Sequence, residues 1–228
     1  QNIKQIIKQE YIKCAKDPVY FMKKYCWIQH PTRGRVQFNL YPFQEGTLNL
    51  LQKNDRNIIL KSRQLGISTL SAGISLWMMV FQKDKSILVV ATKQDTAKNL
   101  VTKVKFMYDN LPSWLQIGFT EKNKLALRLK NGSQIKAVSA ASDAGRSEAI
   151  SLLIIDEAAF IEENRIEEIW GSSQQTLSTG GRAIVLSTPN GTGNFFHRMW
   201  IKAEDGSNGF TPIRLPWTVH PERDQSWR

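Results

Sequence analysis

Cysteine, histidine and long apolar runs are all scarce in this chain of 228 residues. Cys14 and Cys26 are its only cysteines and it has three histidines, so it offers neither a disulfide framework nor the paired ligands of a zinc site. The apolar stretch near residues 76–81 is far too short to span a bilayer, and no basic-then-apolar leader opens the chain. We therefore expect a soluble intracellular protein with reduced thiols and no membrane partner.

Acidic residues are also fewer than basic ones. The chain has 31 Lys and Arg against 20 Asp and Glu, a formal net charge of +11, and such a surface favours a polyanion like nucleic acid. The hydrophobic fraction of 41% is ordinary for a globular domain and argues against disorder. Each basic residue alone is more typical of a solvated surface charge, so only the excess supports nucleic-acid binding. The candidates fall on a predicted helix and hairpin: Lys93, Lys98, Lys103, Lys105, Lys122, Lys124, Arg128, Lys130 and Lys136.

Residues 61–68, Lys-Ser-Arg-Gln-Leu-Gly-Ile-Ser, follow the frame of a phosphate-binding loop. The usual pattern, G-x-x-x-x-G-K-[ST], cradles phosphates with backbone N–H groups at the start of a helix. The second Gly and the Ser are in place, but Lys61 stands where the first Gly belongs and Ile67 where the Lys belongs. Lys61 can reach across a curled loop to the β/γ-phosphates, and Arg63 is a second candidate for that charge. The predicted nucleotide contacts are Lys61, Ser62, Arg63, Gln64, Leu65, Gly66, Ile67, Ser68 and Thr69.

The segments on either side of this loop suit phosphate binding. Residues 57–60 form a short apolar strand, and residues 68–81 have the apolar spacing of a buried helix. Taken alone, the segment is equally compatible with an ordinary strand-to-helix turn that holds no ligand.

A second motif ends in two adjacent carboxylates. Residues 151–155 are an apolar run typical of a strand buried on both faces of a parallel sheet, and Asp156 and Glu157 follow it directly. In nucleotide hydrolysis the first acid holds Mg²⁺ together with the loop hydroxyl, here Ser68, and the second polarises the attacking water. Asp156 and Ser68 are therefore the predicted metal ligands and Glu157 the predicted base. The alternative is a solvated strand end with two charges, which the upstream loop makes less favoured.

Two further segments carry polar or aromatic side chains in suitable places. The predicted strand 182–186 runs into Ser187, Thr188 and Asn190, at the end where open α/β sheets bind ligands. These three residues could couple loss of the γ-phosphate to the rest of the molecule, although Pro, Asn and Gly are also favoured in plain turns. Upstream, Tyr41 and Phe43 offer faces for stacking adenine, or start an amphipathic helix with aromatic core residues.

Together these segments resemble the large terminase subunit of tailed bacteriophages, the ATPase that drives DNA into preformed capsids. The resemblance spans roughly residues 35 to 200 and rests on the three strand-end motifs in order, together with residues 41–44 and 143–148. It implies that Lys61 is the functional lysine and that Gln44 selects adenine through its donor and acceptor. It also implies that Arg146, in a loop of small residues, is an arginine finger acting in cis or in trans. On the residues alone, Arg146 is more typical of a solvated loop arginine.

The resemblance implies partners and a setting as well. The cofactors would be ATP and Mg²⁺ and the substrate double-stranded DNA. The domain would work as a homo-oligomeric ring on the capsid, or be a monomer in isolation, with the portal protein and the small terminase subunit as partners in the host cell cytoplasm. A complete large terminase continues into an RNase H-like nuclease domain, which is absent from this sequence. We therefore expect a fragment with the motor alone and no nuclease activity.

The chain divides into three predicted parts. Residues 1–34 are a helical arm or part of a lid, residues 35–205 are the P-loop ATPase core, and residues 206–228 are a C-terminal segment of the lid without a further periodic element. Strands that alternate with helices, and a hairpin turn at Asn131-Gly132, predict an α/β P-loop fold of the ASCE type. Its central sheet would be mainly parallel and flanked by helices.

Two other functions remain open. A helicase-like nucleic-acid-dependent ATPase shares the loop and the acids, but it should show further motifs in a second motor domain, and this sequence has none. A non-catalytic basic DNA-binding module, with its nucleotide site lost through Ile67, would have no reason to retain Glu157. We favour a terminase domain that hydrolyses Mg-ATP to translocate double-stranded DNA into a procapsid.

Overall fold

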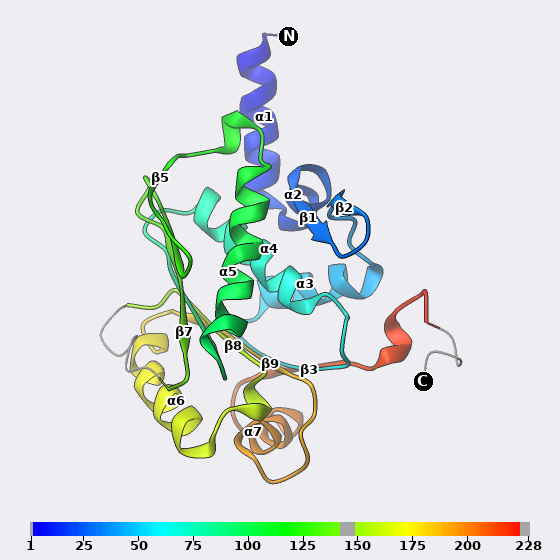
Figure 1. Ribbon diagram of the computed structural model, residues 1–228, viewed down its shortest axis with the longest axis vertical. Coiled ribbons are helices and arrows are strands. Elements are labelled where there is room, and N and C mark those ends of the chain that lie inside the picture. Colours follow the sequence, from blue (N-terminus) through cyan, green and yellow to red (C-terminus); the bar gives the residue numbers. More distant parts are fainter. Residues whose placement is uncertain (1, 142–148, 224–228) are drawn as a thin grey trace.

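A computed structural model describes residues 2–141 and 149–223 of the chain. Within these residues, eight strands form one sheet in the order β10-β3-β9-β8-β4-β7-β6-β5 (Figure 1). The described strands from β10 to β7 run parallel, and β6 and β5 extend that edge as antiparallel strands. The strands are β3 (Arg56–Lys61), β4 (Ser86–Ala91), β5 (Phe119–Lys122), β6 (Ala126–Leu129), β7 (Gln134–Ser139), β8 (Leu152–Asp156), β9 (Arg182–Ser187) and β10 (Thr211–Leu215).

Helices cover both faces of this sheet. One face is covered by α3 (Pro42–Lys53), α4 (Ile67–Phe81) and α5 (Gln94–Asp109), and the other by α6 (Glu163–Leu177) and α7 (Phe195–Glu204), which gives three layers (Figure 1). No helix in the described part of the chain is both long and apolar enough to cross a membrane. The prediction of a mainly parallel sheet flanked by helices is confirmed.

The central strands are buried on both sides because their side chains alternate between two cores. Along β8, Leu152 and Ile154 join the core beneath α4, whereas Leu153 and Ile155 join the core beneath α7. A strand that is buried on both faces has a continuous apolar sequence, as residues 152–155 do. The predicted hairpin around Asn131-Gly132 is also confirmed, because β6 pairs antiparallel with β7.

The N-terminal region packs on the core through both of its helices. It comprises α1 (Ile3–Lys16), α2 (Pro18–Tyr25) and a hairpin of β1 (Trp27–His30) and β2 (Gly34–Gln37). Phe21 and Met22 of α2 are fully buried, and the Trp77 indole N–H of α4 donates to the Cys14 carbonyl at 2.9 Å. The sequence analysis missed the hairpin, whose short strands lack a clear alternation, and the boundary drawn at residue 34 falls inside it.

The prediction that no periodic element follows residue 206 was wrong. β10 pairs in parallel with β3 over five residues, from Thr211 with Asn57 to Leu215 with Lys61. Pro212 is tolerated in this strand because β10 is at the edge of the described sheet, where a missing N–H breaks no ladder. A short 3₁₀ turn, η3 (Trp217–Val219), follows it. This part of the C-terminal segment therefore completes the central sheet.

Candidate active site

Three of the predicted motifs meet at one edge of the sheet. They follow the carboxyl ends of β3, β9 and β8, which are consecutive in the sheet. The parallel register places Leu60 beside Ser187 and Asp156 beside Leu186. Residues far apart in sequence therefore become neighbours at the crevice where parallel α/β sheets bind ligands.

The loop between β3 and α4 has the backbone of an anion site. Gln64 and Gly66 have positive φ values of 56° and 71°, and such left-handed residues let successive N–H groups converge in a concave nest. Within residues 2–141 and 149–223, the backbone N–H groups of residues 63–69 donate to no acceptor. They lie at the N-terminus of α4, where the helix dipole also favours negative charge.

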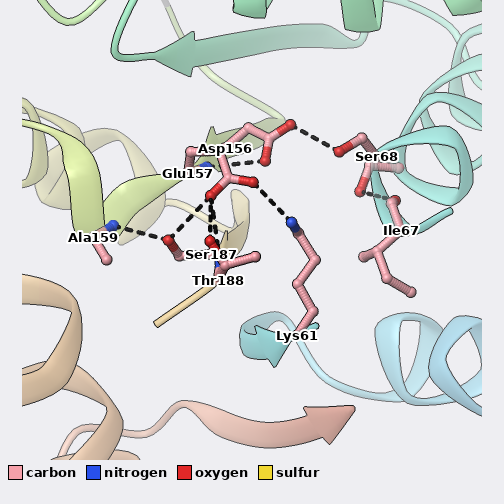
Figure 2. Close-up of polar contacts among 9 residues, drawn as sticks. Lys61, Ile67, Ser68, Asp156, Glu157, Ala159, Ser187 and Thr188 are labelled. Atoms are coloured by element: carbon pink, nitrogen blue, oxygen red, sulfur yellow. Dashed lines mark hydrogen bonds and ion pairs between the residues drawn. The ribbon is translucent and has the colours of Figure 1, made fainter. Parts of the chain in front are cut away.

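Lys61 lies beside the acidic pair. Its side chain is only 8% exposed and its Nζ is 2.8 Å from Oε1 of Glu157 (Figure 2). The Arg63 side chain, by contrast, is exposed and has no ion pair among the described residues. The geometry thus favours Lys61 over Arg63 as the cation of this site, while a phosphate contact by either remains a prediction.

The side chains of Asp156 and Ser68 contact each other, as the predicted metal site requires. The Ser68 hydroxyl donates to Oδ2 of Asp156 at 2.9 Å, and the Glu157 N–H donates to Oδ1 at 2.9 Å (Figure 2). Burial raises the pKa of Asp156, and the charge of Lys61 and the Ser68 hydrogen bond oppose this only in part. The described residues hold no group of three or more His, Cys, Asp or Glu that could bind a metal ion. Two hard oxygens nevertheless fit Mg²⁺, which usually takes its other ligands from water and phosphate.

Glu157 is held in an unusual backbone conformation. Its φ of 51° and ψ of 44° are left-handed, a conformation that costs a non-glycine residue on the order of 1 kcal/mol and often marks functional sites. Burial by itself would raise the pKa of Glu157, but the hydrogen bond and charge of Lys61, helped by Thr188, lower it below its usual value. The carboxylate is therefore kept ionised, as a base needs to be.

The segment after β9 supports Glu157 from the other side. Oε2 of Glu157 accepts from the Thr188 hydroxyl at 3.2 Å and from the Ser187 hydroxyl at 3.5 Å, and the Ser187 hydroxyl oxygen accepts the Ala159 N–H at 3.1 Å (Figure 2). The Asn190 amide donates to the carbonyl of Ala159 at 2.9 Å. The three predicted coupling residues thus contact Glu157 or the turn after it, while their coupling role remains a prediction.

A cavity of about 710 Å³ opens beside these groups. Its lining includes Ser68, Asp156 and Glu157, together with residues of β1 and α5. The hydroxyl and both carboxylates therefore border free space that a ligand can enter.

The predicted adenine platform is partly occupied by the protein. The rings of Tyr41 and Phe43 are nearly parallel, 5.8 Å apart, and His220 lies 4.6 Å from Tyr41. Gln44 is 4% exposed; its Oε1 accepts the Tyr41 N–H at 3.0 Å and its Nε2 donates to the Leu65 carbonyl at 2.9 Å. The Gln44 amide thus holds α3 against the phosphate loop, and base recognition by Tyr41, Phe43 or Gln44 remains a prediction.

Arg146 lies outside the described residues, so its role as an arginine finger stays a prediction.

Arg223 was missed by the sequence analysis, yet its guanidinium donates to the carbonyls of Arg63 and Gln64 in the loop. It belongs to no local motif, because its contact with the loop spans about 160 residues of sequence.

Fold and site together define a P-loop NTPase fold of the ASCE type. The model of the family described as terminase large subunit, T4likevirus-type, N-terminal, matches residues 58–222. The chain belongs to this family.

Solved structures of phage terminases share the fold. The large terminase of bacteriophage HK97 has a TM-score of 0.72 and 17% identity, covering 92% of this chain and 45% of that one. The large terminase ATPase domain of Thermus phage P74-26 has a TM-score of 0.68 and 19% identity, covering 82% and 85%. The large terminase of another thermophilic bacteriophage, in complex with ATP-gamma-S, has a TM-score of 0.63 and 13% identity, covering 82% and 47%. The chain thus spans about half the length of the HK97 terminase and of the terminase bound to ATP-gamma-S.

Proposed function

We propose that this chain is the ATPase motor domain of a viral large terminase, which hydrolyses Mg-ATP to translocate double-stranded DNA into a procapsid. The observation that carries the proposal is the convergence of the Lys61–Glu157 and Ser68–Asp156 pairs next to a loop whose N–H groups lack acceptors among the described residues. Family membership gives this arrangement its biological setting, and one large terminase of the same fold was crystallised in complex with ATP-gamma-S.

The residues suggest an order of events. The N–H groups of residues 63–69 receive the phosphates, and Lys61 exchanges its contact with Glu157 for the β/γ-phosphate oxygens. Glu157, still held by Thr188, is then free to orient water for in-line attack. Ser68 and Asp156 would hold Mg²⁺, which when bound would supply positive charge to neutralise the transferred group. Arg146 completes the site from its own or a neighbouring subunit, and loss of the γ-phosphate is reported through Ser187, Thr188 and Asn190.

Basic residues on one edge of the sheet support DNA as the substrate. Lys122, Lys124, Arg128 and Lys130 are exposed on β5, β6 and the turns beside them, and Lys93 is exposed immediately before α5. Burial, together with the positive charges of Lys122 and Lys98, lowers the pKa of Lys105 on the adjoining helix α5. A positive field of this kind suits sequence-independent contacts with a phosphate backbone. A ring on the capsid, with the portal protein and the small terminase subunit, would bring DNA to this edge.

The test is Mg-ATP hydrolysis measured against protein concentration, with and without double-stranded DNA. Glu157→Gln should abolish turnover, because the amide cannot polarise water, while ATP binding persists. Glu162→Gln is a matched control, since this exposed glutamate at the start of α6 caps nothing with its side chain. A rise in activity per molecule with concentration would indicate that Arg146 acts on a neighbouring subunit.

Three results would contradict the proposal. Equal hydrolysis by wild type and Glu157→Gln would remove the catalytic assignment. Absence of both ATP binding and hydrolysis, with DNA binding retained, would favour a non-catalytic DNA-binding module. Single-strand-dependent hydrolysis with strand separation would instead favour the helicase-like alternative.

A further inference from the structure

The chain segment after β10 crosses the phosphate loop. The Ser62 N–H donates to the Leu215 carbonyl at the end of β10 at 2.9 Å. Further on, the Arg223 guanidinium donates through one nitrogen to the Arg63 carbonyl at 3.1 Å and through the other to the Gln64 carbonyl at 2.9 Å. The proposed mechanism uses neither contact.

The segment is anchored between these contacts. The Tyr41 hydroxyl donates to Oε1 of Glu222 at 2.9 Å, and the Tyr41 ring packs against His220. These two contacts come directly before Arg223 and hold it at the start of α3, close to where Gln44 reaches the loop. The position of the guanidinium is therefore set by side chains and does not depend on the loop alone.

The hydrogen bonds to the loop carbonyls fix the direction of the loop N–H groups. In a trans peptide the carbonyl and the following N–H lie on opposite sides of the chain. Arg223 binds the carbonyls of Arg63 and Gln64, and Gln44 binds that of Leu65. The N–H groups of residues 64, 65 and 66 are consequently directed away from Arg223 and Gln44. Gln64 also has a left-handed φ of 56°, which a non-glycine residue adopts only when its surroundings enforce it.

We propose that Arg223 is a positioning residue of the phosphate loop: its two hydrogen bonds orient the N–H groups of residues 64 and 65 toward the bound triphosphate. The guanidinium acts through the loop carbonyls that it contacts. Its charge also polarises the two peptide groups, which makes their N–H groups stronger donors to phosphate. The inference rests on the proposed function, because it presumes that the loop binds phosphates.

The test compares three ligands across three variants. Arg223→Gln removes the paired charged donors, and Arg223→Lys keeps the charge but replaces the planar two-nitrogen fork with a single ammonium. Arg214→Gln removes an equal charge from an exposed position on β10. Affinities for ATP, tripolyphosphate and adenosine are measured by competition with a fluorescent ATP analogue, and KM and kcat by steady-state hydrolysis. We expect Arg223→Gln to weaken ATP and tripolyphosphate about tenfold, or ~1.4 kcal/mol, with KM affected more than kcat. Arg223→Lys should recover part of this loss, and adenosine affinity should not change.

The possible results separate this inference from the proposed function. If wild type binds neither ATP nor tripolyphosphate, the proposed function fails and the inference fails with it. If wild type binds both but Arg223→Gln behaves like Arg214→Gln, only the role of Arg223 is overturned. An equal loss for adenosine would likewise overturn it, because the segment would then act through the base. Should Arg223→Gln prove unfolded by thermal melting, unchanged tripolyphosphate affinity in a folded Arg223→Lys would overturn it.

Discussion

Replacing Gly66 by Ala should destabilise the protein through two separable effects. Gly66 has a φ of 71°, and forcing alanine into this left-handed conformation costs ~1 kcal/mol. A Cβ built at Gly66 would also lie 2.7 Å from Nε2 of Gln44, so the buried amide must move. That movement breaks its hydrogen bond to the Leu65 carbonyl, at a cost of ~1–2 kcal/mol for a buried group left unpaired. The expected total is ~2–3 kcal/mol.

A double-mutant cycle separates the two effects. Free energies of unfolding are measured in urea for Gly66→Ala, Gln44→Ala and the double variant. Without the Gln44 side chain the clash disappears, so the double variant should be more stable than the sum of the single changes predicts, by ~1 kcal/mol. Gly46→Ala is the control: nothing lies within 4 Å of its Cβ position, and alanine there should stabilise α3 by up to ~1 kcal/mol. Additive effects of the two single changes would refute the proposed contact.

Three further predictions concern the acid pair and the packing of the N-terminal region. Lys61→Met should raise the pKa of Glu157 toward its ordinary value, because the ion pair at 2.8 Å is lost; ¹³C NMR titration of the carboxyl would show no change if the pair does not form in solution. Asp156→Asn should increase stability at pH 7, because the folded-state pKa of Asp156 is raised and its ionised form therefore destabilises the folded state. This gain in stability should vanish below the unfolded-state pKa of ~3.9, where the carboxyl is protonated in both states. Urea unfolding at pH 7 and pH 3 measures the gain, and an equal gain at both pH values would disprove the prediction. Trp77→Phe removes the hydrogen bond to the Cys14 carbonyl and should cost ~1–2 kcal/mol of unfolding free energy; an unchanged urea midpoint would mean that this contact does not hold α1 on the core.

The central elements of the fold were predictable because their signals are local. The apolar run before Asp156 has buried side chains on both faces, and the Asn131-Gly132 turn has the dipeptide that hairpins favour. β10 was missed because Pro212 weakens the local strand pattern, and because its pairing with β3 joins segments about 150 residues apart. Pairing over such a distance is decided by the edge that β3 exposes, which leaves no trace near residue 211.

By itself, the sequence determined that this is an α/β chain of the large-terminase family with a displaced lysine at the start of its phosphate loop. It also placed the three polar motifs at strand ends. The tertiary structure decided which polar groups face one another: that Lys61, and not Arg63, meets Glu157, that Gln44 holds the loop instead of standing free, and that Arg223 reaches the loop from the far end of the described chain. The physical reason is that motif spacing follows from local backbone geometry, whereas the partner of a buried charge or amide depends on which strands lie side by side.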